Sequence, residues 1–184
     1  MGLTVYDFKS CDNLAIIGEK VAEDYYNLLE NIKFVRNVRE DKEYREKDID
    51  LVCSLTSDDV LYVEVKTDSY TSGNMFYELI SNDVTGEKGC MEKTQADLVF
   101  YYFINPSYRS AYIFDVKELR SWVCEHKNDF KLRRVYNRGY CSFGIAIPIE
   151  RLMSDLSNVE RIDLNCISDI ERYEELGRKF WEKK

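Results

Sequence analysis

The amino-acid sequence predicts an α/β fold in which a mixed β-sheet is flanked by helices. The first observation is a helical period between Asn13 and about Ile32, where apolar residues recur at steps of three and four. The second is a pair of β-type runs, Ile49 to Leu55 and Val60 to Lys66, joined by the turn-rich cluster Thr-Ser-Asp-Asp. The third is a final helical stretch, Ser168 to Glu182, which opens on a capping box.

The segments between these elements are assigned in chain order. The charged stretch Arg36 to Lys47 favours a loosely packed strand or loop, and Met75 to Ile80 fits a strand and a short helix equally well. We then predict buried strands at Ala96 to Ile104 and Ala111 to Phe114, followed by a helix at Val116 to Glu125. A basic segment, Lys127 to Arg138, precedes another strand at Gly144 to Ile149. Since no linker or internal repeat divides the chain, we expect one domain over residues 1–184. Its core spans roughly residues 14–115, and a C-terminal elaboration spans roughly 116–184.

Charge and histidine content exclude several classes of function. The 184 residues include 26 Lys and Arg against 34 Asp and Glu, a formal charge of −8. This balance excludes a protein that binds nucleic acid by bulk charge and leaves only local contacts. The single histidine, His126, excludes two-histidine zinc sites and leaves one position for any histidine base. Carboxylate, lysine and tyrosine chemistry remains.

Cysteine spacing and the N-terminal sequence bear on the compartment. The six cysteines form no CxxC pair, so they indicate neither a zinc ribbon nor a secreted disulfide framework. The N-terminus lacks a signal-peptide pattern, and no run approaches the ~18 apolar residues of a membrane span. We therefore expect a soluble cytoplasmic protein with reduced thiols and no membrane partner.

The predicted hairpin gathers charged side chains on one face. Alternation places Glu64 and Lys66 together, while Val63 and Val65 enter the core on the other face. A turn centred on Ser57 matches the apolar faces of both strands and places Asp50 opposite Glu64, so an odd-length loop is expected.

This arrangement predicts metal-assisted hydrolysis of a phosphodiester. Two carboxylates about 5 Å apart at Cβ repel each other, so a structure that keeps them together normally supplies a cation. Mg²⁺ suits such oxygen ligands and retains waters for a substrate phosphate. Lys66 is placed to orient or help deprotonate a water and to stabilise charge on the phosphate.

These residues resemble the PD-(D/E)xK nuclease superfamily, whose signature is an acid on one strand and an ExK-type triplet on the next. The resemblance is closest to the Holliday junction resolvase-like branch and to the YraN family of predicted endonucleases. It covers roughly residues 14–70, through Gly18-Glu19-Lys-Val-Ala22, Ile49-Asp50-Leu51 and Val63-Glu64-Val65-Lys66. The charged insertion before Asp48 and the sequence after Tyr70 depart from the family pattern.

The resemblance implies a restriction-endonuclease-like core and a Mg²⁺- or Mn²⁺-dependent endonuclease that cuts nucleic acid, with DNA expected as the substrate in preference to RNA. It implies that Asp50 and Glu64 bind the metal with the carbonyl of Val65. It further implies that Lys66 is the catalytic lysine and that Glu19 assists from the first helix. By analogy alone, it also implies a homodimer.

Several alternatives stay open. Asp48 competes with Asp50, because both share one face of the predicted strand, and Glu23 competes with Glu19. The basic residues that could contact nucleic acid fit a solvated surface equally well; they are Lys93, Lys131, Arg133, Arg134 and Arg138. A function of another class is a catalytically inactive nuclease-fold module that binds a protein or nucleic-acid partner, which the net charge and the 14 tyrosines favour.

Overall fold

The computed structural model describes residues 8–69, 72–105 and 109–181. The helices of this part are α1 (Phe8–Asn27), α2 (Lys42–Arg45), α3 (Cys90–Lys93), α4 (Val116–His126), α5 (Ile149–Asp155) and α6 (Ile170–Trp181). The strands are β1 (Ile32–Asn37), β2 (Leu51–Leu55), β3 (Val60–Asp68), β4 (Asn74–Asn82), β5 (Glu87–Lys88), β6 (Leu98–Phe103), β7 (Ser110–Asp115), β8 (Leu132–Tyr136), β9 (Cys141–Pro148) and β10 (Val159–Asp163). Among the described residues, no helix is long and apolar enough to cross a membrane.

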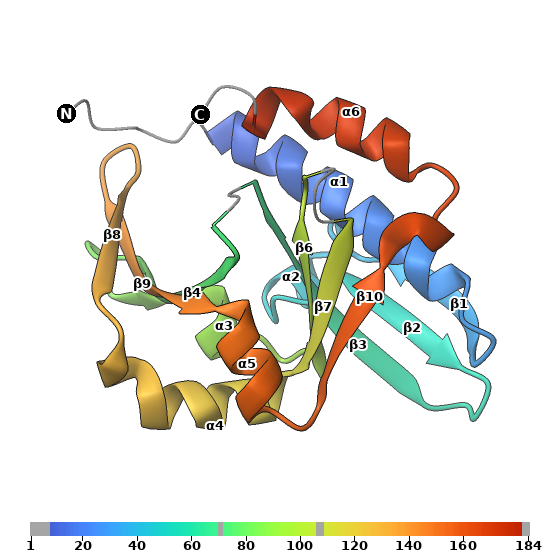
Figure 1. The fold of residues 1–184 in the computed structure, drawn as a ribbon, viewed down its shortest axis with the longest axis horizontal. Coiled ribbons are helices and arrows are strands. Elements are labelled where there is room, and N and C mark those ends of the chain that lie inside the picture. The colour runs from blue at the N-terminus through green and yellow to red at the C-terminus, as the bar shows by residue number, and fades with distance from the viewer. Residues whose placement is uncertain (1–7, 70–71, 106–108, 182–184) are drawn as a thin grey trace.

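A six-stranded sheet forms the centre of the fold, in the order β1-β2-β3-β6-β7-β10. β3 and β6 run parallel, whereas the other neighbouring strands run antiparallel. Helices α1 and α6 pack against each other over one face of this sheet (Figure 1). The prediction of an α/β fold with a mixed sheet flanked by helices is confirmed.

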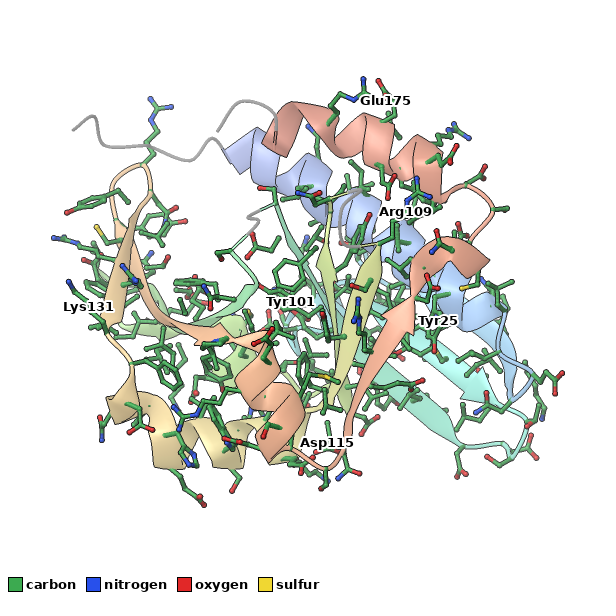
Figure 2. All side chains as sticks on the ribbon, in the orientation of Figure 1. Tyr25, Tyr101, Arg109, Asp115, Lys131 and Glu175 are labelled. Atoms are coloured by element: carbon green, nitrogen blue, oxygen red, sulfur yellow. The ribbon has the colours of Figure 1, made fainter. Side chains whose placement is uncertain are left out.

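A second, four-stranded antiparallel sheet has the order β5-β4-β9-β8. The segment Met75–Ile80, which fitted two structures in the sequence, belongs to its strand β4. Side chains of this sheet, α4 and α5 share a buried cluster with the face of the central sheet that α1 does not cover (Figure 2); members include Val99, Tyr101, Tyr77, Ile145, Leu119 and Leu152. The central sheet is thus covered on both faces.

The β2–β3 hairpin has the predicted register. Leu51 pairs with Val63, and the ladder continues beyond β2, because the N–H of Asp50 donates to the carbonyl of Val63 with 2.9 Å between N and O. At the other end the N–H of Leu55 donates to the carbonyl of Asp59 at 2.9 Å, which leaves a three-residue turn between them. The predicted odd-length loop is confirmed.

Helix α1 ends earlier than its apolar period. The helix stops at Asn27, and the N–H of Leu28 bonds back to the carbonyl of Tyr25 at 3.0 Å as the chain turns. Ile32 begins β1 and packs against the same buried cluster as α1, which is why the apolar spacing continues after the helix has ended. The charged stretch that follows contains the rest of β1 and the short helix α2.

Candidate active site

Glu64 and Lys66 lie side by side in β3, on the face that alternation predicts. Glu64 is 3% exposed, and its Oε1 is 2.6 Å from Lys66 Nζ. Burial raises the pKa of Glu64 to about 8; Lys66 opposes this shift and Asp50 adds to it. Val63 and Val65 point the other way, into the cluster beneath α1. A buried acid and a partly exposed ammonium are therefore held together.

Asp50 is tied to the strand that carries this pair. Its main-chain N–H bonds to the carbonyl of Val63, and its carboxylate Oδ2 accepts the N–H of Val65 at 2.8 Å. The register of the hairpin puts Asp50 opposite Glu64. The structure therefore brings the predicted acid, acid and lysine together.

Glu19 approaches this group from α1. It is 3% exposed, accepts a hydrogen bond from Asn37 Nδ2 at 3.2 Å, and forms an ion pair with Arg39. Burial and the charge of Asp50 raise the pKa of Glu19, whereas Asn37 and Arg39 lower it. Glu19 is thus within electrostatic reach of Asp50, as the resemblance implies. For the competing Glu23, the structure shows a main-chain contact, in which its carbonyl accepts the side-chain N–H of Asn27.

Asp48 does not share the strand geometry of Asp50. Its φ of 48° lies in the left-handed region, so Asp48 is not part of an extended strand. The alternation that predicted a face shared with Asp50 therefore does not reach Asp48. Its Oδ2 lies 3.4 Å from Lys93 Nζ, and burial raises its pKa while Lys93 and Lys66 lower it. The expectation that both aspartates belong to one strand face is wrong, although Asp48 stays close enough to act on the pKa of Glu64.

Lys66 has a second neighbour that sequence reasoning missed. The thiol of Cys90, at the start of α3, makes a hydrogen bond with the Lys66 side chain, and burial raises the pKa of that thiol to about 12. Burial works to lower the pKa of Lys66, but Cys90, Glu64 and Asp50 together hold it above its ordinary value. Cys90 lies 24 residues after Lys66, and the sequence carries no signal that could have joined them.

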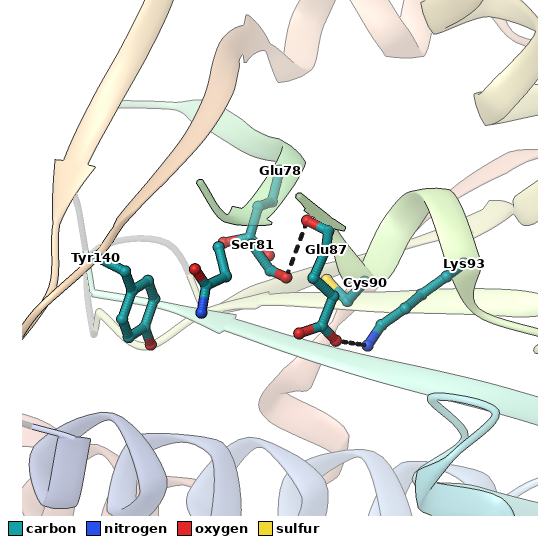
Figure 3. A pocket seen from close by; sticks show the side chains of 7 residues that line it. Glu78, Ser81, Glu87, Cys90, Lys93 and Tyr140 are labelled. Carbon is teal, nitrogen blue, oxygen red and sulfur yellow. Dashed lines mark hydrogen bonds and ion pairs between the residues drawn. The ribbon is translucent and has the colours of Figure 1, made fainter. Parts of the chain in front are cut away.

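A polar pocket adjoins this group on the side of the second sheet. Its volume is about 280 Å³, and it is lined by Glu78, Ser81, Asn82, Glu87, Cys90, Lys93 and Tyr140. Figure 3 shows Tyr140 at one end and Lys93 at the other, with Glu78, Ser81 and Glu87 between them. Lys93 Nζ is also 2.8 Å from Glu87 Oε1. Of the predicted nucleic-acid contacts, Lys93 is the one that lines this pocket.

The other predicted basic residues lie in or beside β8, an exposed strand. Arg133 pairs with Gly144, which also pairs with Glu78, so Arg133 and Glu78 share one face of the second sheet. Arg134 points to the opposite face, where its guanidinium carbon lies 4.9 Å from the centroid of the Tyr136 ring. Lys131 and Arg138 precede and follow the strand. The basic residues therefore do not form one surface.

The residues of this group fit a hard divalent cation, with two carboxylates and a main-chain carbonyl as donors. The charge of Asp50 raises the pKa of both Glu19 and Glu64, as expected where carboxylates face one another without a cation between them. In the described ranges, His, Cys, Asp and Glu form no ready-made group of three or more that could hold a metal. Any cation here would therefore keep solvent or substrate oxygens among its ligands, as Mg²⁺ usually does.

Comparison with known proteins gives a distant likeness to a solved structure. No family model matches the chain, and no curated protein matches it. A solved structure described as "Structure of D212, a nuclease from a fusselovirus" aligns with 98% of this chain and 99% of its own, at 12% identity and a TM-score of 0.38. That likeness is too low to support a functional argument, so any proposal depends on the residues of this chain.

Proposed function

We propose that this protein is a nuclease of the PD-(D/E)xK type that hydrolyses phosphodiester bonds, preferentially in DNA, with Mg²⁺ or Mn²⁺ as its cofactor. The observation that carries the proposal is the position of Asp50 opposite Glu64, with Lys66 Nζ 2.6 Å from the Glu64 carboxylate. An acid on one strand and an acid-x-lysine triplet on its partner meet the requirements of metal-assisted hydrolysis.

Asp50, Glu64 and the carbonyl of Val65 would hold the metal ion. When bound, the ion supplies Lewis-acid chemistry, because it neutralises charge on the phosphate and favours the ionised form of a water. The hydrogen bond from the N–H of Val65 fixes the orientation of the Asp50 carboxylate before any ion arrives. The buried Glu64 side chain has little freedom to turn away.

Lys66 and Glu19 perform the remaining steps in this proposal. The Lys66 ammonium leaves Glu64 for a non-bridging phosphate oxygen, where it offsets the charge that grows as water attacks. Glu19, fixed by Asn37 and Arg39, accepts a hydrogen bond from the attacking water and orients it. Neither step needs a histidine, in agreement with the single His126 of the chain.

A cleavage assay tests the proposal. Supercoiled, linear, single-stranded and branched DNA, together with RNA, are incubated with the protein in Mg²⁺, Mn²⁺ or EDTA. Glu64→Gln and Lys66→Met remove the charged groups with little change of shape. Glu175→Gln is the matched control, because Glu175 is an exposed acid of α6 that pairs with Arg178 away from this group. We expect metal-dependent cleavage by the wild type and by Glu175→Gln, and a loss of at least about 100-fold in the other two.

A catalytically inactive binding module is the second candidate. The ion pair between Glu64 and Lys66, which satisfies both groups without a metal, favours it, as does the net charge of −8. The same assay separates the two functions. If the wild type, Glu64→Gln and Lys66→Met do not differ in cleavage of any substrate, the nuclease proposal is wrong and the binding module is the function to adopt.

A further inference from the structure

The pocket beside Lys66 is not used by the proposed hydrolysis. We propose that it receives one unpaired nucleobase of the substrate, next to the bond that is cut. The protein would then act on nucleic acid that contains single-stranded or unpaired nucleotides. The inference rests on the proposed function and names the substrate class for that site.

The position of the pocket supports this assignment. Cys90 lines the pocket and makes a hydrogen bond with Lys66, and Lys93 lines it and pairs with Asp48, two residues before Asp50. Lys66 thus lies between the pocket residue Cys90 and the candidate metal ligand Glu64. A nucleotide whose phosphate reaches Asp50 and Glu64 has its base within reach of this pocket.

The charge of the lining selects a base rather than a phosphate. Glu78 and Glu87 both line the pocket, so a second phosphate would meet two carboxylates. Glu78 is held in place by hydrogen bonds with the Ser142 hydroxyl and the main-chain N–H of Cys90. A carboxylate has about four acceptor positions, so acceptors remain for the amino and imino donors of a base.

The pocket lining also contains hydrogen-bond donors. Asn82 Oδ1 accepts the N–H groups of Val84 at 2.9 Å and Thr85 at 3.3 Å, and its amide Nδ2 has no partner within the described part of the chain. Lys93 adds an ammonium at the rim. A lining that both accepts and donates matches the edge of a nucleobase, which carries donors and acceptors side by side.

Tyr140 supplies the remaining element, a planar surface. Its ring lies at the end of the pocket opposite Lys93 (Figure 3). Bases stack on aromatic side chains with little regard to sequence. The volume of about 280 Å³ is at the small end for ligand sites and suits one base rather than a base pair. A paired base would first have to leave its stack, which costs a few kcal/mol, so unpaired nucleotides are preferred.

Substitution of Tyr140 tests the inference. Tyr140→Ala removes the stacking surface, Tyr140→Phe keeps it, and Tyr136→Ala is the matched control, because that ring is covered by Arg134 on the opposite face. Binding of a fluorescein-labelled 15-mer single-stranded DNA is measured by anisotropy in EDTA. Cleavage in Mg²⁺ is measured on the same strand, on a fully paired duplex and on a duplex with a one-nucleotide bulge.

We expect the wild type to cut the single strand and the bulged duplex faster than the paired duplex. Tyr140→Ala should raise Kd and KM for the first two by about tenfold with kcat within about twofold, whereas Tyr140→Phe and Tyr136→Ala should match the wild type. Equal Kd and KM for Tyr140→Ala and wild type, or equal cleavage of paired and unpaired DNA, would overturn the pocket assignment. Binding that depends on Tyr140 without any cleavage would support the nucleobase pocket and contradict the proposed nuclease activity. The failure of one proposal can therefore be told from the failure of the other.

Discussion

The Asp50 carboxylate accepts the main-chain N–H of Val65 at 2.8 Å, and this hydrogen bond locks a candidate metal ligand to the strand that carries its partner, Glu64. The same carboxylate raises the pKa of both Glu19 and Glu64. Asp50 therefore contributes a hydrogen bond and an attraction to Lys66, which are favourable, and a repulsion of the two glutamates, which is unfavourable. Substitutions can separate the hydrogen bond from the charge.

Asp50→Asn should abolish cleavage and be more stable in EDTA than Asp50→Ala. The amide oxygen of asparagine can still accept the N–H of Val65, and both variants lose the same charge interactions with Glu19, Glu64 and Lys66. Asp50→Ala also loses the acceptor, and an unpaired main-chain N–H costs about 1–3 kcal/mol. Thermal unfolding in EDTA should therefore rank Asp50→Asn above Asp50→Ala. An asparagine variant no more stable than the alanine variant would contradict this relationship.

Gly18→Ala should destabilise the protein, because helix α1 crosses β3 closely at this residue. A Cβ at Gly18 would lie 1.7 Å from Thr67 Oγ1 and 2.9 Å from Thr67 Cβ. Overpacking of this kind costs about 1–3 kcal/mol in the free energy of unfolding, which denaturant titration can measure. Thr67→Ala in the same chain removes the nearest atom and should restore part of the loss.

Gly86→Ala is the control for this prediction. Gly86 has a φ of 72° and nothing within 4 Å of its added Cβ, so its substitution reports backbone strain without a clash. Thr67→Ala combined with Gly86→Ala should show no recovery. Equal recovery in both pairs would mean that the close approach of Gly18 to Thr67 does not determine the loss.

The hairpin could be predicted from sequence because its signals are local. Alternation of apolar residues and the turn around Ser57 fix both the faces and the register, and the structure has Leu51 opposite Val63 as a consequence. These two constraints were sufficient to bring Asp50, Glu64 and Lys66 together.

The second sheet could not be predicted, since it depends on pairing between distant segments. Met75 pairs with Ile147, 72 residues further along the chain, and no local pattern specifies that partner. The pocket depends on this pairing, because Glu78 belongs to β4 and Tyr140 directly precedes β9, its partner strand. Asn37 and Arg39 were missed for a different reason. They lie in a charged stretch whose composition resembles an ordinary solvated surface.

Thiol labelling at pH 8 should distinguish buried from exposed cysteines. Burial raises the pKa of Cys53 to about 11 and that of Cys90 to about 12, so both remain thiols at pH 8, and the thiolate is the reactive form. Cys124 and Cys166 are exposed. Mass mapping after a short treatment with iodoacetamide should therefore find label on the exposed pair first. In denaturant all should react alike. Label on the half-buried Cys90 as rapid as on Cys124 in the folded protein would contradict the raised pKa of the Cys90 thiol.

Arg133 and Arg134 are adjacent in sequence but should differ in their effect on nucleic-acid binding. Arg133 shares its face of the second sheet with Glu78, which lines the pocket, whereas Arg134 lies over the Tyr136 ring and 3.8 Å from Asp83 on the opposite side. Arg133→Ala should weaken binding of a labelled single-stranded DNA and reduce the slope of log K against log salt by about one. Arg134→Ala should leave that slope unchanged and lower stability slightly through the lost ring contact. Equal slopes for the two variants would mean that both arginines, or neither, contact the phosphates, and the division of the basic residues between two faces would then have no functional meaning.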